Sequence, residues 1–229
     1  MGITKVTPPP KQPRQRAVPT PVAARGRQKA STAGTDEKRE RILKAAEALF
    51  DQQGYANTTM AQIVQALGVT KPYVYYYFHN KQEIFETLSW RPTVVCFTTM
   101  DFAPDDARAA HEKVTEGLER LIRATIEHYP ASCFPYREPQ VYRPEYVMAQ
   151  EKLANDFYEK LCALLEAGRR DGMFDFNETR ITAQAACSLP GFLYNWYRPD
   201  GRLPAEAVTA ELVQLAWRVL GLRRTRRRK

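Results

Sequence analysis

Five tyrosines and two lysines in a short stretch without acidic residues are the groups in this sequence best placed to bind a partner. The stretch runs from Gly54 to Lys81, and four of its tyrosines fall within five consecutive positions that begin at Tyr73. A helix surface with hydroxyls, positive charge and no carboxylate suits a DNA groove, because phosphates would repel a carboxylate. A tyrosine-rich core helix is the alternative interpretation of the same residues.

The residues 58–81 predict two short helices joined by a tight turn. Thr59 can cap the first helix, because Gln62 lies three residues further on, at capping-box spacing. Gly68 favours the left-handed conformation that ends a helix, and Thr70 can then cap the second helix, whose first turn tolerates Pro72. This is the sequence form of a helix-turn-helix. One apolar face recurs along the first helix at Met60, Ile63, Val64 and Leu67.

The second of these helices has two distinct sides. A rotation of about 100° per residue turns Val74 and Phe78 toward the first helix. Tyr73 and Tyr76 then point away from the first helix, so the sequence predicts that these tyrosines face the partner.

Length and composition restrict the class of protein. A chain of 229 residues can hold one large domain or two smaller ones. No apolar run approaches the roughly 18 residues that a membrane span needs, and the N-terminus lacks the apolar region of a secretory signal. We therefore expect a cytoplasmic protein with no membrane partner. Four dispersed cysteines and three dispersed histidines show no metal-ligand spacing, so we expect no metal and no cofactor.

The net charge of +8 is unevenly distributed. Residues 1–35 carry +7 and residues 221–229 carry +6, which leaves −5 for the residues between them. An acidic body with two basic ends does not attract nucleic acid over its whole surface. Any affinity for DNA must therefore come from a local site.

The run from Arg41 to Leu88, RILKAAEALFDQQGYANTTMAQIVQALGVTKPYVYYYFHNKQEIFETL, resembles the N-terminal DNA-binding domain of the TetR family of transcriptional regulators. The resemblance covers roughly residues 38–88, with A-x-x-L-F, G-Y-x-x-T-T, I-x-x-x-L-G-V and Y-x-Y-F-x-N-K in order. It implies an all-α fold, with an N-terminal three-helix helix-turn-helix domain and a larger C-terminal helical bundle for ligand binding and dimerisation. The sequence departs from many relatives at Tyr73, where they have a small residue.

The expected domain division follows from this resemblance and from the helical patterns. We predict a disordered, basic, proline-rich arm at 1–35 and a DNA-binding domain at 36–82. These are followed by an effector-binding and dimerisation domain at 83–222 and by a basic tail at 223–229. An amphipathic helix at 35–53 carries Asp36, Glu37 and Glu40 in its first turn, where they suit the helix dipole. Further helices are expected at about 81–100, 104–129, 144–172, 177–197 and 204–221, around a proline-broken segment at 130–143.

The resemblance also implies which residues contact DNA. Thr59 would bind a phosphate through its hydroxyl and the amides of a helix N-terminus. Lys71 would meet a phosphate or a base edge, and Tyr75 would reach the DNA backbone. None of these residues offers the well-defined arginine–guanine or amide–adenine pairing, so the operator sequence is not predicted. The complete expected set is Thr59, Thr70, Lys71, Pro72, Tyr73, Tyr75, Tyr76, Tyr77 and Lys81.

An effector pocket is implied among aromatic and basic residues of the middle helices, although ordinary core is the alternative role for most of these aromatics. An arginine there could bind an anionic head group. The segment NWYRPDGRLPAEAVTAEL is similar to family members that sense acyl-CoA thioesters, so the expected effector is a small apolar molecule or an acyl-CoA. The candidate ligand-binding residues are Phe97, Phe102, Arg123, His128, Phe134, Tyr136, Arg137, Arg143, Tyr146, Phe157 and Tyr194.

The last two long helices are expected to pair with those of a second subunit. The resemblance implies a four-helix interface whose twofold symmetry matches a pseudo-palindromic operator. Packing within one chain is the alternative, and some of these residues must serve it as well. The predicted interface residues are Leu189, Phe192, Leu193, Trp196, Leu212, Leu215 and Val219.

We therefore expect a homodimeric, ligand-responsive transcriptional repressor that binds a double-stranded operator. Pro92 would interrupt the helix that links the two domains and could form a hinge. A single-stranded nucleic-acid binder that uses the tyrosines and basic tails is one alternative. An all-α enzyme is another, but the sequence shows no nucleophile–base pair or phosphate-binding loop, and we expect no catalytic residue.

Overall fold

The computed structural model describes residues 29–223, and of the side chains those from Gly34 onward. This range contains helices and no strands, which confirms the all-α prediction. The predicted N-terminal arm lies mostly, and the basic tail almost entirely, outside the described residues. The α-helices are α1 (Lys29–Asn57), α2 (Met60–Leu67), α3 (Lys71–Tyr77), α4 (Lys81–Phe97), α5 (Ala110–Glu127), α6 (Phe134–Arg137), α7 (Pro144–Arg170), α8 (Thr179–Gly191), α9 (Leu193–Trp196) and α10 (Ala205–Val219).

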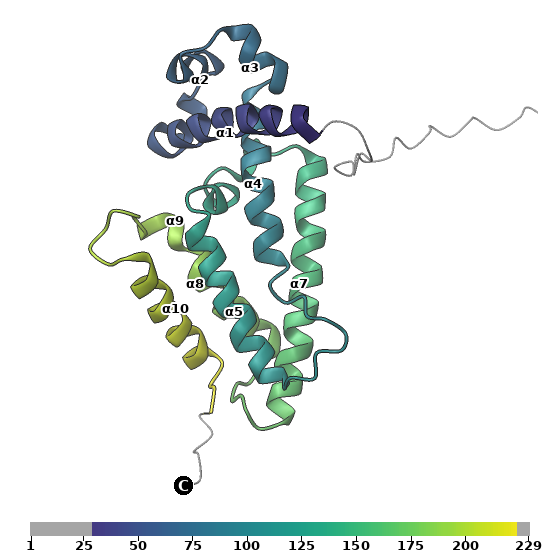
Figure 1. The fold of residues 1–229 in the computed structure, drawn as a ribbon. Coiled ribbons are helices and arrows are strands. Elements are labelled where there is room, and N and C mark those ends of the chain that lie inside the picture. The colour runs from purple at the N-terminus through teal and green to yellow at the C-terminus, as the bar shows by residue number, and fades with distance from the viewer. Residues whose placement is uncertain (1–28, 224–229) are drawn as a thin grey trace, which may run out of the picture.

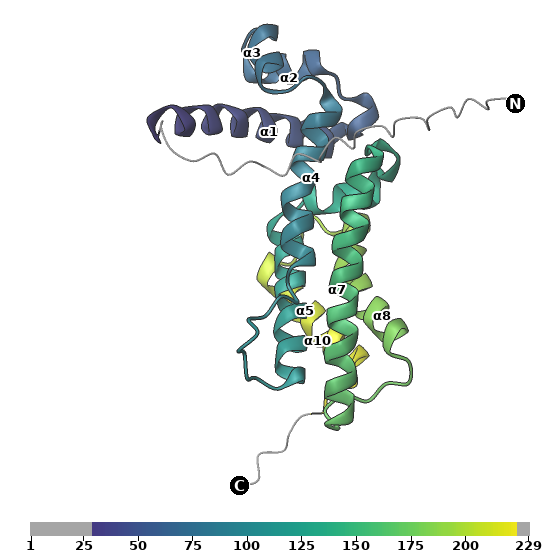
Figure 2. The same cartoon turned by 90° about the vertical axis from the view of Figure 1, so that its right-hand side faces the viewer.

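The helices α1 to α3 form a head that sits on one end of a helical bundle (Figures 1 and 2). The long helix α4 leads from the head into the bundle, where it lies alongside α5 and α7. The helices α8 and α10 complete the bundle by packing against each other and against α5. The fold therefore joins a small helical head to a larger bundle, as the resemblance implies.

The ends of α2 follow from local hydrogen bonds, as predicted. The backbone N–H of Thr59 donates to Gln62 Oε1 at 2.8 Å, and the N–H of Gln62 donates to Thr59 Oγ1 at 3.2 Å, which forms the capping box. Gly68 ends the helix with a φ of 64°, a left-handed conformation that favours glycine. The predicted side-chain cap at Thr70 is wrong, because its hydroxyl makes no capping hydrogen bond to α3.

The predicted start of the first helix is also wrong. The helix α1 begins at Lys29, so Asp36, Glu37 and Glu40 lie beyond its first turn and do not interact with the dipole at its start. Gly54 adopts a φ of 79°, a left-handed conformation that kinks the helix near its C-terminus. Tyr55 then packs back onto Phe50, with ring centroids 5.7 Å apart.

The core of the head continues across the predicted domain boundary at residue 82. Ile42, Phe50, Ile63, Val74 and Phe78 are buried in the head, as their periodicity predicts. The same cluster includes Ile84 and Phe85 of α4, Phe134 of α6, Tyr142 just before α7, and Tyr146 in the first turn of α7. The head therefore shares a continuous apolar interface with the near end of the bundle.

The bundle differs from the predicted helix boundaries at two main places. The helix expected from residue 104 begins at Ala110, because residues 98–109 form turns and a loop. The helix expected at 177–197 is interrupted after Gly191, where the short helix α9 starts. By contrast, α4 continues from Lys81 to Phe97 through Pro92, so the helix does not end at this proline. The segment 130–143 holds only short helices, as predicted.

Candidate DNA-binding surface and ligand chamber

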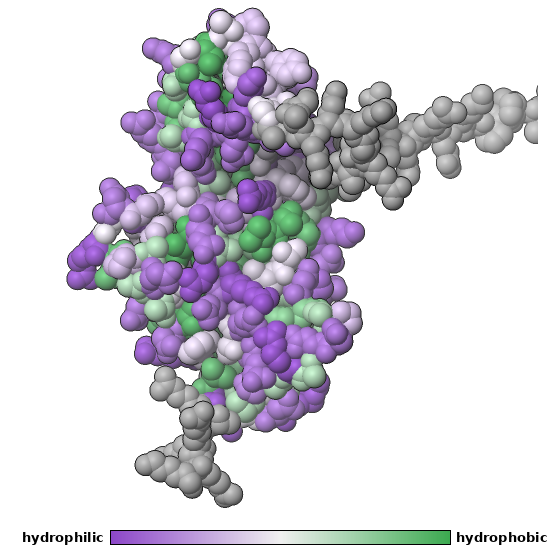
Figure 3. Space-filling model, viewed as in Figure 1, coloured by the Kyte–Doolittle hydropathy of each residue, from purple (hydrophilic) through white to green (hydrophobic). Residues whose placement is uncertain are grey.

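The outward face of α3 is formed by side chains that the head does not bury. Val74 and Phe78 are fully buried beneath the helix, whereas Tyr76 is 79% exposed. Of the other predicted DNA-binding residues, Thr59, Thr70, Lys71, Pro72 and Tyr75 are exposed, and Tyr73 and Tyr77 are half-buried. Side chains of intermediate hydropathy cover this end of the head (Figure 3). The structure thus brings most of the predicted set onto one accessible surface.

The tyrosine rings of α3 do not stack in parallel. The rings of Tyr73 and Tyr77 lie 5.5 Å apart with an interplanar angle of 59°, and those of Tyr76 and Tyr77 lie 5.0 Å apart at 85°. Unpaired bases stack on aromatic faces that are open to them. Because these rings meet at steep angles, nothing in this arrangement favours a stacking platform for single-stranded nucleic acid.

Lys81 has a different position from the one predicted. Its ammonium donates to the carbonyl oxygens of Tyr55 at 2.7 Å and Thr58 at 2.8 Å, and lies 4.1 Å from the Tyr55 ring centre. Desolvation lowers the pKa of this amine. The side chain therefore joins the turn between α1 and α2 to the start of α4, and its donors are used within the protein.

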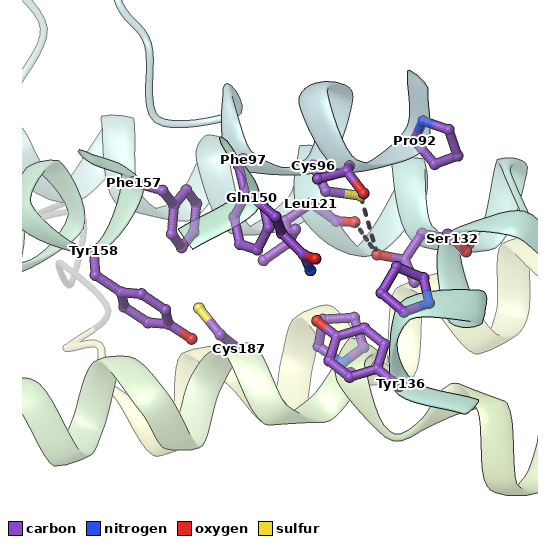
Figure 4. A pocket seen from close by; sticks show the side chains of 15 residues that line it. Pro92, Cys96, Phe97, Leu121, Ser132, Tyr136, Gln150, Phe157, Tyr158 and Cys187 are labelled. Carbon is purple, nitrogen blue, oxygen red and sulfur yellow. Dashed lines mark hydrogen bonds between the residues drawn. The ribbon is translucent and has the colours of Figure 1, made fainter. Parts of the chain in front are cut away.

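A chamber lies in the bundle, close to the head, between α4, α5, α6, α7 and α8. It holds about 540 Å³ of empty space, counting the part that is open to solvent, and about 50 Å³ of that space can take the centre of a water-sized molecule. Figure 4 shows side chains from these helices pointing into the space. The lining residues are Pro92, Thr93, Cys96, Phe97, Leu121, Thr125, Ser132, Pro135, Tyr136, Gln150, Phe157, Tyr158, Cys187, Pro190 and Gly191.

Only three of the predicted ligand residues line this chamber, namely Phe97, Tyr136 and Phe157. The predictions for Phe134 and Tyr146 are wrong because both are buried in the core shared with the head. Phe102 lies outside the chamber, beneath the guanidinium groups of Arg108 and Arg120. His128 and Tyr194 line separate surface grooves.

The arginines that were predicted to contact an effector do not line this chamber either. Each arginine forms an ion pair elsewhere: Arg123 binds Glu206 at 2.8 Å, Arg137 binds Asp51 at 2.7 Å, and Arg143 donates from Nε to Glu86 at 2.7 Å. In these pairs each guanidinium already meets a carboxylate, which is its preferred partner. None of the three arginines lines the chamber.

The sequence prediction missed most of the chamber because its lining includes small polar and sulfur-containing residues. Six of the lining residues are of types that do not by themselves indicate a binding site, namely Cys96, Thr125, Ser132, Gln150, Tyr158 and Cys187. One signal was available, since Gln150 and Phe157 are seven residues apart and therefore lie on the same face of a helix.

An exposed apolar strip runs along α8, α9 and α10. We define the strip as Ile181, Phe192, Trp196, Leu215 and Val219, all of which are exposed. Ile181 was not predicted, and Leu189 is half-buried beside the strip. The predictions for Leu193 and Leu212 are wrong, because both side chains are buried in the core of their own chain. The strip is formed by other residues of the same region, Phe192 and Trp196 beside Leu193, and Leu215 and Val219 on the helix of Leu212.

Two other classes of site are not found in residues 29–223. None of the helices there is long and apolar enough to cross a membrane. The same residues contain no cluster of three or more histidine, cysteine or acidic side chains that could hold a metal ion.

Two family profiles match this chain. Residues 42–88 match the description "Bacterial regulatory proteins, tetR family". Residues 93–220 match "Tetracyclin repressor-like, C-terminal domain". The two matches cover both the head and the bundle, so they account for most of the chain.

Individual relatives are consistent with these profiles. The chain is 42% identical over 172 residues to the regulator TtgR of Pseudomonas putida, covering 74% of this chain and 70% of TtgR. It is 26% identical over 198 residues to the repressor KstR2 of Rhodococcus jostii, covering 80% of this chain and 91% of KstR2. The solved structure of PfmR from Thermus thermophilus is similar with a TM-score of 0.68 and 29% identity, covering 80% of this chain and all of PfmR.

A further solved structure shares the fold, that of AibR in complex with isovaleryl coenzyme A and operator DNA. It aligns with a TM-score of 0.60 and 19% identity, covering 78% of this chain and 97% of AibR. The helix-turn-helix geometry, the bundle and the two profile matches agree, and the chain belongs to the TetR family of transcriptional regulators.

Proposed function

We propose that this regulator is a homodimeric repressor whose two α3 helices bind an operator and release it when an effector fills the chamber. The observation that carries the proposal is a direct link between chamber and head. Tyr136 lines the chamber, and the next residue, Arg137, binds Asp51 of α1 at 2.7 Å. A ligand that displaces Tyr136 therefore also acts on the contact that positions the head.

The exposed face of α3 supports the DNA-binding part of the proposal. Tyr76 extends into solvent with no carboxylate on its helix, and Lys71 adds positive charge at the start of that helix. Thr59 lies at the N-terminus of α2, where backbone amides and the helix dipole favour a phosphate. In this arrangement Thr59 and Lys71 fix the position on the DNA, while Tyr73 and Tyr76 reach the major groove.

Replacing Tyr76 with alanine is expected to weaken operator binding by about fivefold or more, because the lost hydroxyl removes a hydrogen bond worth about 1 kcal/mol and the lost ring removes further contact. The stability should change little, since the side chain is 79% exposed. Footprinting on the DNA that flanks the gene would locate the operator, and gel-shift titration would give the affinity.

Two further variants serve as controls. Tyr76→Phe removes only the hydroxyl, so it measures the contribution of the hydroxyl apart from that of the ring. Met148→Ala removes an exposed side chain on α7 and not on α3. An unchanged footprint and affinity for Tyr76→Ala would show that α3 does not read DNA through this face.

The exposed apolar strip supports dimerisation. Large apolar side chains rarely lie together on the surface of a monomer unless they contact a partner. Phe192 and Trp196 are 58% and 51% exposed in the single chain. A second copy related by a twofold axis would cover this strip with the same strip of its own. The two α3 helices would then be placed to contact two half-sites of one operator.

The link between chamber and head supports the response to an effector. Arg137 also donates to the hydroxyl of Tyr129 at 2.6 Å, so the guanidinium is held from both sides. An effector can change DNA affinity only by the ratio of its affinities for the two states of the protein. We propose that these states differ in whether Arg137 holds Asp51.

Replacing Asp51 with asparagine is expected to weaken the coupling between effector and operator by about fivefold, because a part-exposed ion pair contributes up to about 1 kcal/mol. The operator affinity with and without a saturating effector gives the coupling directly. Asp101→Asn is the matched control, since Asp101 pairs with Lys160 at 2.6 Å within the bundle. Equal coupling in the two variants would exclude the Arg137–Asp51 contact from the response.

Repression is the proposed direction of regulation. Among the similar proteins, KstR2 and BepR are named as repressors, although FasR is named as an activator. A reporter fused to the operator region should gain expression when the gene is deleted. A loss of expression in the deletion strain would instead identify an activator.

An acyl-CoA is one candidate effector. The support comes from AibR, whose structure contains isovaleryl coenzyme A, and from the apolar chamber, which suits an acyl chain. The anionic part of such a ligand would have to lie outside the chamber, because no cationic residue lines it.

A further inference from the structure

We infer that the effector is an uncharged, largely apolar molecule with one hydrogen-bonding group, a carbonyl, carboxamide or hydroxyl, that Gln150 and Tyr136 bind. This inference rests on the proposed function, and it narrows that function to a class of ligand. It also identifies Gln150 as a specificity-determining residue of the chamber.

The chamber contains no charged residue that could balance a charged ligand. All of its lining side chains are apolar, aromatic, thiol, hydroxyl or carboxamide groups. An ion that enters such a space loses its hydration and gains no counter-ion, which is strongly unfavourable. A neutral ligand does not lose this hydration energy, so the chamber selects against carboxylates and phosphates.

The titratable groups of the lining are also held in their neutral forms. Burial raises the pKa of Cys96 to about 11 and that of Cys187 to about 12. Burial likewise raises the pKa of Tyr136 to about 12 and raises the pKa of Tyr158. At neutral pH the thiols are therefore protonated and poor nucleophiles.

Several hydroxyl groups of the lining already have partners in the protein. Thr125 Oγ1 donates to the carbonyl oxygen of Leu121 at 2.8 Å, and Ser132 Oγ donates to that of Thr125 at 2.7 Å. Thr93 Oγ1 donates to the carbonyl oxygen of Ser89 at 2.8 Å. Each of these hydroxyls already donates its proton, so it can only accept a hydrogen bond from a ligand.

The carboxamide of Gln150 and the hydroxyl of Tyr136 are different. Neither makes a hydrogen bond to any residue in the part of the chain that the structure describes. Figure 4 shows the Gln150 carboxamide near the middle of the chamber, between Phe97 and Tyr136. A carboxamide can both donate and accept, so it pairs with a carbonyl, a carboxamide or a hydroxyl. A ligand can therefore use donors and acceptors that no other group of the protein occupies.

The walls around these two groups require an apolar ligand body. The rings of Phe97 and Phe157 meet edge to face, 5.7 Å apart, along one wall. Leu121 and Pro190 add further apolar surface. Such walls are favourable for hydrocarbon or aromatic groups, because their transfer from water removes apolar surface from the solvent.

The test uses the full-length dimer and matched pairs of probes that differ only in charge. The pairs are octanamide with octanoate and cinnamamide with cinnamate, and octanoyl-CoA is the fifth probe. For each probe, the shift in Tm and the concentration that releases operator DNA are measured. At least one amide should bind and release the operator at a concentration about tenfold or more below that of its carboxylate and of octanoyl-CoA.

Two variants connect this preference to the chamber. Gln150→Leu should weaken binding of the active amide about tenfold, and Asn155→Leu, which removes an exposed carboxamide from the same helix, should leave it unchanged. Tyr136→Phe removes only a hydroxyl and serves as the second variant if Gln150→Leu fails to fold.

Each outcome decides the inference. It is overturned if a carboxylate or octanoyl-CoA is the stronger ligand, if neither amide binds, or if Gln150→Leu and Tyr136→Phe both bind as the parent protein does. A protein that fails to bind operator DNA in the absence of any probe would instead overturn the proposed function. The two failures are therefore distinguishable.

Discussion

Replacing Phe192 and Trp196 together with glutamate is expected to convert the dimer to a monomer and to lower operator affinity about a hundredfold or more. In the proposed dimer the twofold axis brings both strips together, so four carboxylates would be buried against each other. Without the partner, each head binds one half-site alone, and the gain from linking two sites, about 10²- to 10⁴-fold, is lost. The folding of each chain should be retained because both side chains are more than half exposed.

Met148→Glu is the control for this experiment. Met148 is 68% exposed on α7, outside the strip, so the same change of chemistry there should leave the dimer intact. Sedimentation velocity gives the oligomeric state, and gel-shift titration on the full operator gives the affinity. A double variant that remains dimeric would show that another surface forms the interface.

Replacing Phe85 with alanine is expected to lower the free energy of unfolding by about 3–5 kcal/mol, because it leaves a cavity in a fully buried site. The Phe85 ring stacks on Phe134 with centroids 4.8 Å apart, and it meets the rings of Phe50 and Tyr55 at 5.1 and 4.9 Å. These rings come from α1, α4 and α6, so one substitution loosens both the head and its attachment to the bundle.

Denaturant unfolding monitored by circular dichroism would measure this loss. Phe85→Leu is the matched control and should cost less than alanine, since it fills more of the same space. We also expect the variant to lose operator affinity, because a loosened head no longer holds its α3 helix at a fixed distance from that of its partner. An alanine variant as stable as the parent would show that the shared core does not join the two parts.

The local structure of the head could be predicted from sequence because its determinants are close together along the chain. The Thr59–Gln62 capping box joins residues three positions apart, and Gly68 ends the same helix by its own backbone conformation. The periodicity of Ile63 and of Val74 with Phe78 likewise identifies buried faces without knowledge of what covers them. A helix start was predicted wrongly where the sequence offers several capping residues. Thr35 can cap a helix, but it lies inside α1, which begins at Lys29.

The chamber could not be predicted in the same way. Arg123, Arg137 and Arg143 have the right chemistry for an anionic ligand, but each binds a carboxylate far away in the sequence. The partners are separated by 83, 86 and 57 residues, respectively. Only the packing of the helices decides whether a guanidinium meets a ligand or a protein carboxylate. The inferred preference for neutral ligands therefore depends on the tertiary structure.

The sequence by itself determined the family, the all-α fold and the helix that we propose to face DNA, since these follow from local spacing and from motifs in a fixed order. The tertiary structure decided which residues those helices expose or bury. Leu193 is buried and its neighbour Phe192 is exposed, and Lys81 points into the protein while Tyr76 points out. Spacing along one helix identifies its faces, but contacts between distant segments determine which face meets core, solvent or ligand.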